Sequence, residues 1–399
     1  MTTLSVVIPA YNEEKGIANI CQRVLAVQPA LAGVGVEGLE LLVVDDGSHD
    51  RTVEIVAAIP GARLIRHSHN KGYGGALKTG FAQASGELVG FLDADGTYPP
   101  EYFPQLCQAA LNGAELVIGS RMAGEKSQMP FARRVGNLFF ATLLSLVARQ
   151  RVSDSASGMR VFQRRILECM YPLPDGLNLT PVMSTRAIHE GVRVVEVPIP
   201  YAERVGRSKL SILRDGRIFL QSILWTALTY NPVRILGILG TFALLFTAVV
   251  GLGFVIARLT GVTSLSPLGV TALYSALVAA LIGVNLFALG VTFNYLVSLF
   301  YQKPIRQGLF GKPLFKTPLD RQFGWMGLLS MFVGMLVGIV SLALGWTGWQ
   351  IDRLWLYLTG SALMFLVGLQ LVVYYILFRV LDELSQRELL TRQDLEEMG

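Results

Sequence analysis

Four long stretches almost free of charged residues lie in the second half of this 399-residue chain and strongly constrain its fold. They cover roughly residues 235–256, 268–296, 325–346 and 354–378. Each holds about the 20 apolar residues that an α-helix needs to cross the hydrocarbon core of a bilayer. The bilayer core offers no hydrogen-bond partners to an open backbone, so segments of this length cross it as helices. The sequence therefore predicts an all-α four-helix transmembrane domain over residues 233–380.

The apolar excess is confined to that half of the chain. Overall, 52% of the residues are hydrophobic, 16% are charged and the mean hydropathy is +0.48, which is too apolar for an ordinary soluble enzyme. Residues 1–200 have a normal globular composition and are numerous enough to bury a core. Within the apolar stretches we expect Asn285 and Gln370 to form interhelical hydrogen bonds rather than to contact a substrate.

The charges between the apolar stretches predict their orientation. The loop between the second and third stretches carries Lys303, Arg306, Lys312, Lys316 and Arg321. Because basic loops remain in the cytoplasm, we expect an integral multi-pass protein whose N-terminal domain and C-terminal tail, residues 381–399, are both cytoplasmic. The N-terminus shows no basic region followed by an apolar run, so no cleaved signal peptide is expected. Three widely spaced cysteines fit a reducing compartment.

Short apolar runs alternate with helical patterns through the first half. The expected strands are residues 4–8, 39–44, 62–65, 88–92, 116–118 and 192–199, and the expected helices are residues 13–27, 52–58, 74–84 and 104–111. This alternation is typical of βαβ units. We therefore predict an α/β fold with a doubly wound, mostly parallel sheet.

Polar clusters follow three of these strands, at Pro9–Glu13, Asp45–Ser48 and Asp93–Asp95. Ligands bind at the carboxyl ends of the strands in such sheets. Asp93 and Asp95 repel each other unless a cation lies between them, and a hard divalent ion that holds a diphosphate meets that need. A pair of solvated turn aspartates is the alternative, but three clusters at one sheet edge favour the metal–diphosphate site.

Two basic amphipathic segments follow. Residues 131–151 have an apolar face with arginines at both ends, which favours a helix lying on a membrane surface over a packed core helix. Residues 204–232 form a basic amphipathic juxtamembrane segment, with Trp225 and Tyr230 expected at headgroup level. His67 and His69 would share one side of a strand, and we interpret them as surface residues.

A set of motifs, in order, resembles family 2 glycosyltransferases of the GT-A fold. More narrowly it is similar to the polyprenyl-phosphate sugar synthases, the group that includes dolichyl-phosphate mannose synthase. The motifs are VVIPAYNEE (6–14), VVDDGSHDRT (43–52), NKGYGGALKTG (70–80), FLDADGTYPPEYFPQL (91–106), IGSR (118–121), PFARRVGN (130–137), SDSASGMRVF (153–162) and VPIPYAERVGRSKL (197–210). The resemblance implies a cytosolic GT-A catalytic domain over residues 1–203.

The resemblance also implies roles for individual residues. The nucleotide-binding residues would be Pro9, Tyr11, Glu13, Asp46 and Asp93. The acceptor phosphate would be bound by Arg121, Arg133, Asn137, Arg204 and Lys209. Asp95, Arg121, Arg133 and Arg204 would be catalytic. Mg²⁺ or Mn²⁺ would be held by Asp95, with Asp93 and Thr97, while the role of Asp154 is left open.

One departure from the family pattern affects the donor. The mannose synthases carry a glutamine as an extra metal ligand two residues after the second aspartate, and this chain has Thr97 there. Either Thr97 binds the metal through a water, or the metal ligands and the donor differ from those of the mannose synthases. A carboxylate at Asp46 can accept an imide N–H of the base, and the ring of Tyr11 can pack on that base.

The implied activity is an inverting, metal-dependent transfer of a hexose from GDP-mannose or a UDP-hexose to a polyprenyl or dolichyl monophosphate at the cytoplasmic membrane face. A phosphate monoester is largely dianionic at neutral pH and needs no general base, which suits motifs without an evident Asp–His couple. The expected partners are this donor, this acceptor and the bilayer, with no nucleic acid. A homo-oligomer is left open.

Two alternatives stay open from the sequence. A processive membrane polysaccharide synthase would need more spans and a Q-x-x-R-W motif, which this chain lacks. A non-enzymatic carrier or flippase of lipid-linked sugars would use the four helices and a sugar-binding domain.

Overall fold

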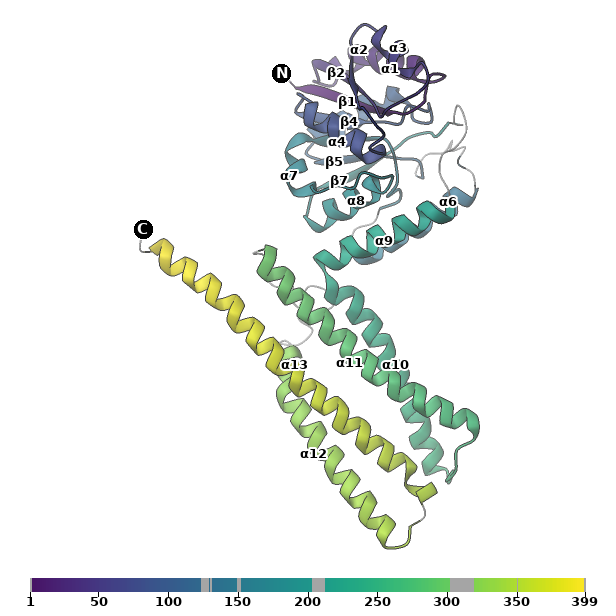
Figure 1. The fold of residues 1–399 in the computed structure, drawn as a ribbon, viewed down its shortest axis with the longest axis vertical. Helices are drawn as coiled ribbons and strands as arrows, with labels where there is room; N and C mark the ends of the chain where they lie inside the picture. The colour runs from purple at the N-terminus through teal and green to yellow at the C-terminus, as the bar shows by residue number, and fades with distance from the viewer. Residues whose placement is uncertain are drawn as a thin grey trace. The chain divides into compact units, whose positions relative to one another are not determined.

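A computed structural model describes residues 2–122, 129, 131–148, 152–202, 212–301, 319–349 and 351–397 (Figure 1). In its helices the side chains of residues 132–133, 146–148, 212–213, 301, 319–320, 351–353 and 385–397 are not described. The chain divides into two compact units, Met1–Ala227 and Leu228–Gly399.

The first unit is built on a seven-stranded sheet, counted over the described residues, in the order β3-β2-β1-β4-β6-β5-β7. Its strands are β1 (Thr3–Ala10), β2 (Gly38–Asp45), β3 (Ala62–Arg66), β4 (Leu88–Phe91), β5 (Leu116–Ser120), β6 (Arg160–Gln163) and β7 (Val194–Pro198). Only β6 runs antiparallel to its neighbours, β4 and β5; the other described pairs are parallel. The predicted α/β class with a mostly parallel sheet is confirmed.

Helices cover both faces of this sheet. They are α1 (Ile17–Ala26), α2 (Gln28–Ala32), α3 (Thr52–Ala57), α4 (Tyr73–Gln83), α5 (Phe103–Leu111), α6 (Phe131–Ala148), α7 (Leu167–Met170), α8 (Leu179–His189) and α9 (Ile212–Tyr230), with 3-10 turns η1 (Pro100–Tyr102) and η2 (Arg164–Ile166). Val6 and Ile8 belong to a core that includes side chains of α1 and α5, whereas Val7 belongs to a core that includes side chains of α4 and α8. Both faces are buried, which explains why the strands read as continuous apolar runs.

The predictions missed the strand β6, the helix α8, and the short helices and turns α2, α7, η1 and η2. β6 has only four residues and begins with an arginine, so its sequence carries little strand signal. The side chain of Arg160 is nevertheless fully buried. Two hydrogen bonds offset the cost of burying it: Nε donates to Ser157 O at 3.1 Å, and Nη2 donates to Ser155 O at 2.9 Å. α8 is buried almost all round, which leaves no polar face to reveal a helical period.

The second unit consists of four described helices: α10 (Pro232–Leu259), α11 (Pro267–Tyr301), α12 (Leu319–Trp346) and α13 (Ile351–Glu397). By length and composition all four can cross a membrane, with mean hydropathies of 2.1 to 2.4 in their most apolar windows. They pair as two hairpins, α10 with α11 and α12 with α13. By length and composition, the second half of the chain therefore has the four membrane-spanning helices that the sequence predicted.

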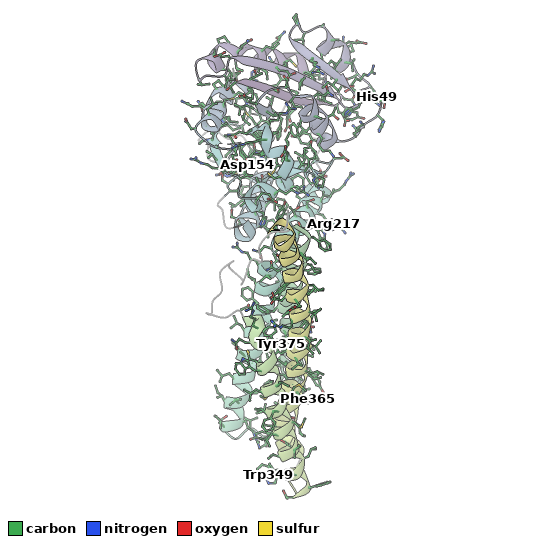
Figure 2. The ribbon with its side chains drawn as sticks, turned by 90° about the vertical axis from the view of Figure 1, so that its left-hand side faces the viewer. His49, Asp154, Arg217, Trp349, Phe365 and Tyr375 are labelled. Carbon is green, nitrogen blue, oxygen red and sulfur yellow. The ribbon has the colours of Figure 1, made fainter. Side chains whose placement is uncertain are left out.

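Glycines set the close approach within each hairpin. A Cβ added at Gly240 of α10 would lie 2.8 Å from the carbonyl oxygen of Gly283 in α11. In the other hairpin Gly324 of α12 lies against the ring of Tyr375 and Gly334 against the backbone of Phe365, both on α13 (Figure 2). Small residues let helix backbones pack closely where lipid supplies no hydrophobic driving force.

Two described hydrogen bonds join the hairpins, and one of them is the bond of Trp355 Nε1 of α13 to the carbonyl oxygen of Thr263 at 3.0 Å. Tyr374 of α13 donates its hydroxyl to Oδ1 of Asn285 in α11 at 2.6 Å, so the expected interhelical hydrogen bond of Asn285 is confirmed. The Oε1 atom of Gln370 is buried and has no hydrogen-bond partner among the residues that the structure describes. The expectation for Gln370 therefore stays a prediction.

Candidate active site

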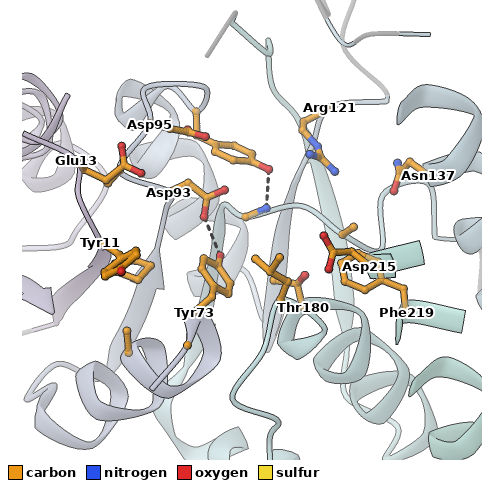
Figure 3. Close-up of a pocket in the computed structure, with 18 of the residues that line it drawn as sticks. Tyr11, Glu13, Tyr73, Asp93, Asp95, Arg121, Asn137, Thr180, Asp215 and Phe219 are labelled. Atoms are coloured by element: carbon orange, nitrogen blue, oxygen red, sulfur yellow. Dashed lines mark hydrogen bonds between the residues drawn. The ribbon is translucent and has the colours of Figure 1, made fainter. Parts of the chain in front are cut away.

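A cavity of about 400 Å³ opens at the carboxyl ends of β1, β2, β4 and β5, all in the first unit (Figure 3). The predicted site residues that line it are Pro9, Tyr11, Glu13, Asp46, Asp93, Asp95, Arg121 and Asn137. Figure 3 shows Glu13, Asp93 and Asp95 on one side and Arg121 with Asn137 on the other. Parallel strands bring their carboxyl ends to one edge, which is why Pro9 and Arg121, 112 positions apart, meet in one cavity.

Three predicted site residues cannot be placed in this cavity. Arg204 and Lys209 lie outside the described residues, and Arg133 has a described backbone in α6 but no described side chain. Their roles remain predictions from the sequence. Thr97 lies next to the cavity rather than in its lining and is 1% exposed.

The two aspartates after β4 are held by neighbouring hydroxyl groups. Tyr73 donates its hydroxyl to Oδ1 of Asp93 at 2.8 Å. Oδ1 of Asp95 accepts from the Thr97 hydroxyl at 2.6 Å and from the Thr97 backbone N–H at 3.1 Å. The turn from Asp95 to Thr97 is possible because Gly96, which lies between them, has a φ of 76°. Thr97 thus fixes the orientation of the Asp95 carboxylate.

Gly158 allows the loop before β6 to reach Asp93. A Cβ at this position would lie 2.5 Å from the Asp93 carboxylate, well inside contact distance. The backbone N–H of Gly158 donates to the hydroxyl of Tyr98 at 2.7 Å. Asp93 is therefore packed between Tyr73 and this loop, to which the sequence had assigned no role in holding it.

The carboxylates match what a hard divalent ion accepts from a protein. Among the described residues no group of three or more His, Cys, Asp and Glu side chains is placed to hold a metal. Mg²⁺ is commonly held by one or two carboxylates together with substrate phosphates and waters. Asp95 and Asp93 line the cavity and fit a site of this type, in which one or two carboxylates hold the ion together with substrate phosphates.

Arg121 is clamped by Asp154, the residue whose role the sequence left open. Arg121 Nε donates to Asp154 Oδ2 and Nη2 donates to Oδ1, both at 2.7 Å, while the Arg121 backbone N–H donates to Oδ2 at 3.0 Å. The guanidinium carbon lies 5.8 Å from the centre of the Tyr98 ring and 5.5 Å from that of Tyr201. The bidentate pair and the two rings hold the cation in one orientation.

The pair also shifts both pKa values. Burial alone would lower the pKa of Arg121, but the nearby Asp154 carboxylate outweighs burial and raises it well above its ordinary value. Burial alone would raise the pKa of Asp154, but Arg121 outweighs it and the pKa falls below its ordinary value. Both groups therefore stay charged across the physiological range.

The interpretation of His67 as a surface residue was wrong. Its side chain is buried, with Nδ1 2.8 Å from Asp46 Oδ1 and Nε2 2.9 Å from Thr79 Oγ1. The chain therefore contains an Asp–His couple that no motif revealed. Sequence reasoning missed it because the partners are 21 residues apart and meet only when β2 and β3 pair. His69, by contrast, is exposed as predicted.

The glycine-rich stretch before and within α4 packs against protein rather than forming an anion site. The backbone N–H groups of Gly74 and Gly75 both donate to the carbonyl oxygen of Asp175, at 2.7 and 3.1 Å. A Cβ at Gly74 would lie only 2.1 Å from the carbonyl oxygen of Pro174. The first turn of α4 is thus capped by a loop 100 residues away, which places Gly72 and Tyr73 in the cavity wall.

The far wall comes from three helices. Asn137 and Phe140 belong to α6, Thr180 to α8, and Asp215 and Phe219 to α9 (Figure 3). The rings of Phe140 and Phe219 are 5.9 Å apart and join α6 to α9. The sequence predicted α6 and α9 as amphipathic segments and did not predict α8, and it did not indicate that these helices complete the cavity.

Comparison with known proteins identifies the family. The model of Glycosyl transferase family 2 matches residues 5–171, and a model described as Domain of unknown function (DUF8752) matches residues 232–392. The chain is 30% identical over 305 residues to undecaprenyl-phosphate 4-deoxy-4-formamido-L-arabinose transferase of Aeromonas hydrophila, which covers 73% of this chain and 88% of that protein. It is 33% identical over 220 residues to dolichyl-phosphate hexose transferase of Haloferax volcanii, covering 55% and 92% respectively.

A crystal structure of glucosyl-3-phosphoglycerate synthase from Mycobacterium tuberculosis, in complex with Mn²⁺, uridine diphosphate and phosphoglyceric acid, is also similar. It is 23% identical with a TM-score of 0.46, over 57% of this chain and 78% of that one. With the sheet, the edge cavity and the sequence matches together, the chain is an α/β transferase with a membrane domain. It belongs to glycosyl transferase family 2, and the predicted glycosyltransferase of GT-A architecture is confirmed.

Proposed function

We propose that this glycosyltransferase moves a hexose from a nucleoside diphosphate sugar to a polyprenyl or dolichyl monophosphate at the cytoplasmic face of a membrane. Relatives named as undecaprenyl-phosphate and dolichyl-phosphate sugar transferases support a lipid phosphate as the acceptor. The observation that carries the proposal is the composition of one cavity. Its sheet-edge wall holds the Asp93–Asp95 pair, and its far wall is made by the amphipathic helices α6 and α9.

The outer faces of α6 and α9 support contact with lipid. On α6 the side chains of Phe131, Val135, Leu138 and Phe139 are exposed, with Phe131 at 81%. On α9 Trp225 is 67% exposed, and this helix ends at Tyr230, two residues before α10 begins. Amphipathic helices with exposed aromatic residues lie in the interface of a bilayer. An acceptor with a lipid tail would reach the cavity along such helices.

The reaction requires little proton transfer. An oxygen of the acceptor phosphate attacks the anomeric carbon, the bond from that carbon to the donor diphosphate oxygen breaks, and the nucleoside diphosphate leaves with the electron pair. Attack from the side opposite the leaving group inverts the anomeric configuration. Because the second pKa of a phosphate monoester is about 6, the nucleophile is largely deprotonated at neutral pH. The main task of the enzyme is therefore to stabilise the negative charge of the acceptor phosphate and of the leaving diphosphate.

Each residue has a role in that task. Arg121, oriented by Asp154 and by the rings of Tyr98 and Tyr201, would stabilise phosphate charge in the cavity. Asn137 would donate a hydrogen bond to the acceptor phosphate, and Arg133, Arg204 and Lys209 would add positive charge. Tyr11, Glu13, Pro9 and Asp46 would hold the nucleoside. Asp95, oriented by Thr97, would hold Mg²⁺ or Mn²⁺ with Asp93; the bound ion would neutralise charge on the leaving diphosphate.

Purified protein, Mn²⁺ or Mg²⁺, a panel of nucleotide sugars and a polyprenyl phosphate should yield a glycosyl phospholipid detectable by mass spectrometry. Asp95→Ala is expected to reduce transfer by about 100-fold or more, and a chelator should abolish it. Arg63→Gln, an exposed change on β3 away from the cavity, is the control. Full activity in Asp95→Ala would refute the metal assignment. A polymeric product would favour a polysaccharide synthase, and no transfer from any donor would favour a carrier.

A further inference from the structure

The hydrogen-bond capacity of Asp46 restricts which base this cavity can recognise. Oδ1 of Asp46 accepts from the Lys71 backbone N–H and from His67 Nδ1, both at 2.8 Å. Oδ2 accepts from the Gly72 backbone N–H at 2.9 Å. A carboxylate has about four acceptor positions, two on each oxygen. Counted over the described residues, one position remains, on Oδ2, and Asp46 lines the cavity.

His67 makes the first oxygen unavailable. A carboxylate oxygen can only accept, so the ring nitrogen of His67 that faces Asp46 carries a proton. The other ring nitrogen lies 2.9 Å from the hydroxyl of Thr79 on α4, which keeps the imidazole in place. His67 and Lys71 together saturate Oδ1.

The neighbouring side chain supplies a donor. Asn70 also lines the cavity, and its Oδ1 accepts from the Gly72 backbone N–H at 3.0 Å. That bond identifies the oxygen end of the amide, so the exposed end is the NH₂ group. The recognition edge thus presents one acceptor, Asp46 Oδ2, beside one amide donor, Asn70 Nδ2.

Building on the proposed function, we infer that this edge selects a donor nucleotide with an imide base, uracil, over guanine. Uracil presents one N–H between two carbonyl oxygens, which matches one acceptor beside one donor. Guanine presents N1–H and an exocyclic NH₂ side by side and needs two acceptors, but Oδ1 is already occupied. Adenine and cytosine place a ring-nitrogen acceptor where the carboxylate needs a donor. A donor left unpaired on burial weakens binding of the wrong base.

Nucleotide binding tests this without catalysis. Full-length protein in detergent with Mn²⁺ is titrated by calorimetry with UDP, GDP, CDP and ADP. We expect UDP to bind at least about tenfold more tightly than GDP, equivalent to about 1.4 kcal/mol. GDP binding as tightly as UDP, or more tightly, would overturn the base assignment while leaving the transferase proposal intact. Failure of every nucleotide to bind would contradict the proposed function itself.

Variants of His67 test the reason for the selectivity. His67→Leu removes the donor to Asp46 Oδ1, so the ratio of the GDP and UDP dissociation constants should fall toward one. His67→Gln keeps an amide donor and should preserve more of that ratio. His69→Leu, an exposed neighbour on the same segment, should leave the ratio unchanged. If His67→Leu weakened both nucleotides equally, His67 would serve packing alone and the acceptor count would be wrong.

Discussion

At the scale of single residues, the Arg121–Asp154 pair shows how a buried cation is held in one orientation. Asp154 is fully buried and also receives support from Glu196, whose carboxylate accepts from the Asp154 backbone N–H at 3.0 Å. Ser153 donates its hydroxyl to the same glutamate at 2.8 Å. A guanidinium held this firmly loses little orientation when a phosphate binds, so Asp154 acts as a positioning residue for Arg121.

The lowered pKa of Asp154 predicts a pH-dependent loss of stability. Asp154→Asn should reduce the free energy of unfolding by about 3 kcal/mol at neutral pH, because it leaves Arg121 without its charge partner. A carboxylate whose folded pKa is depressed contributes stability above its unfolded pKa of about 4, and this contribution disappears as the pH falls through the folded value. Melting temperatures from pH 3 to 8 should therefore show the variant and the wild type converging at the acidic end. A constant difference over that range would contradict the pairing.

Thr97 provides a second residue-scale prediction. Thr97→Val keeps the shape of the side chain but removes the hydroxyl that donates to Asp95 at 2.6 Å. Because a hydrogen bond to a charged group contributes about 1.5–3 kcal/mol, we expect kcat/KM to fall by about tenfold or more. Thr97→Ser, which retains the hydroxyl, should preserve most activity. Wild-type metal dependence and rate in Thr97→Val would show that Asp95 needs no such support.

At the scale of elements, packing of the membrane helices depends on where each glycine faces. Gly240 and Gly253 both lie in α10, but a Cβ at Gly240 would clash with α11, whereas nothing lies within 4 Å of one at Gly253. Gly240→Ala should therefore lower the melting temperature in detergent by several degrees. Gly253→Ala should leave it unchanged or raise it, because alanine favours the helix by about 1 kcal/mol. Equal effects of the two substitutions would contradict the observed α10–α11 contact.

The α4 segment is the other informative element. Its glycines pack against protein, because Gly74 and Gly75 donate their backbone N–H groups to the carbonyl oxygen of Asp175. Lys78 of α4 adds an ion pair with the Asp175 carboxylate at 2.6 Å. These contacts join the loop after α7 to the helix that carries Tyr73, so the loop supports the wall of the cavity.

At the scale of the whole molecule, the four apolar helices found among the described residues predict the topology of the chain. With an even number of spans and a basic central loop, both ends of the chain should lie on the cytoplasmic side. Tags at the N-terminus and the C-terminus should be equally protected from protease in sealed, right-side-out vesicles, and equally cleaved in inverted ones. A C-terminal tag with the opposite accessibility would refute the four-span orientation.

The sequence by itself determined the class of the fold and most of the residues at its edge. Strand-length apolar runs alternate with helical periods, and parallel strands necessarily align their carboxyl ends, so Glu13, Asp46, Asp95 and Arg121 were predictable as neighbours. The four spans followed from length and hydropathy alone. These features are local, or follow from one topological rule, and a single sequence contains them.

Only the tertiary structure decided how those residues are held. The partners of Asp46, Asp93 and Arg121 are His67, Tyr73 and Asp154, and two of these three had appeared in the sequence as a surface histidine and an unmarked tyrosine. Such pairs form between segments 20 to 33 residues apart, where a side chain's environment depends on which strands and loops pack together. Saturation of Asp46 Oδ1, on which the inferred preference for uracil rests, is a property of that packing and not of any motif.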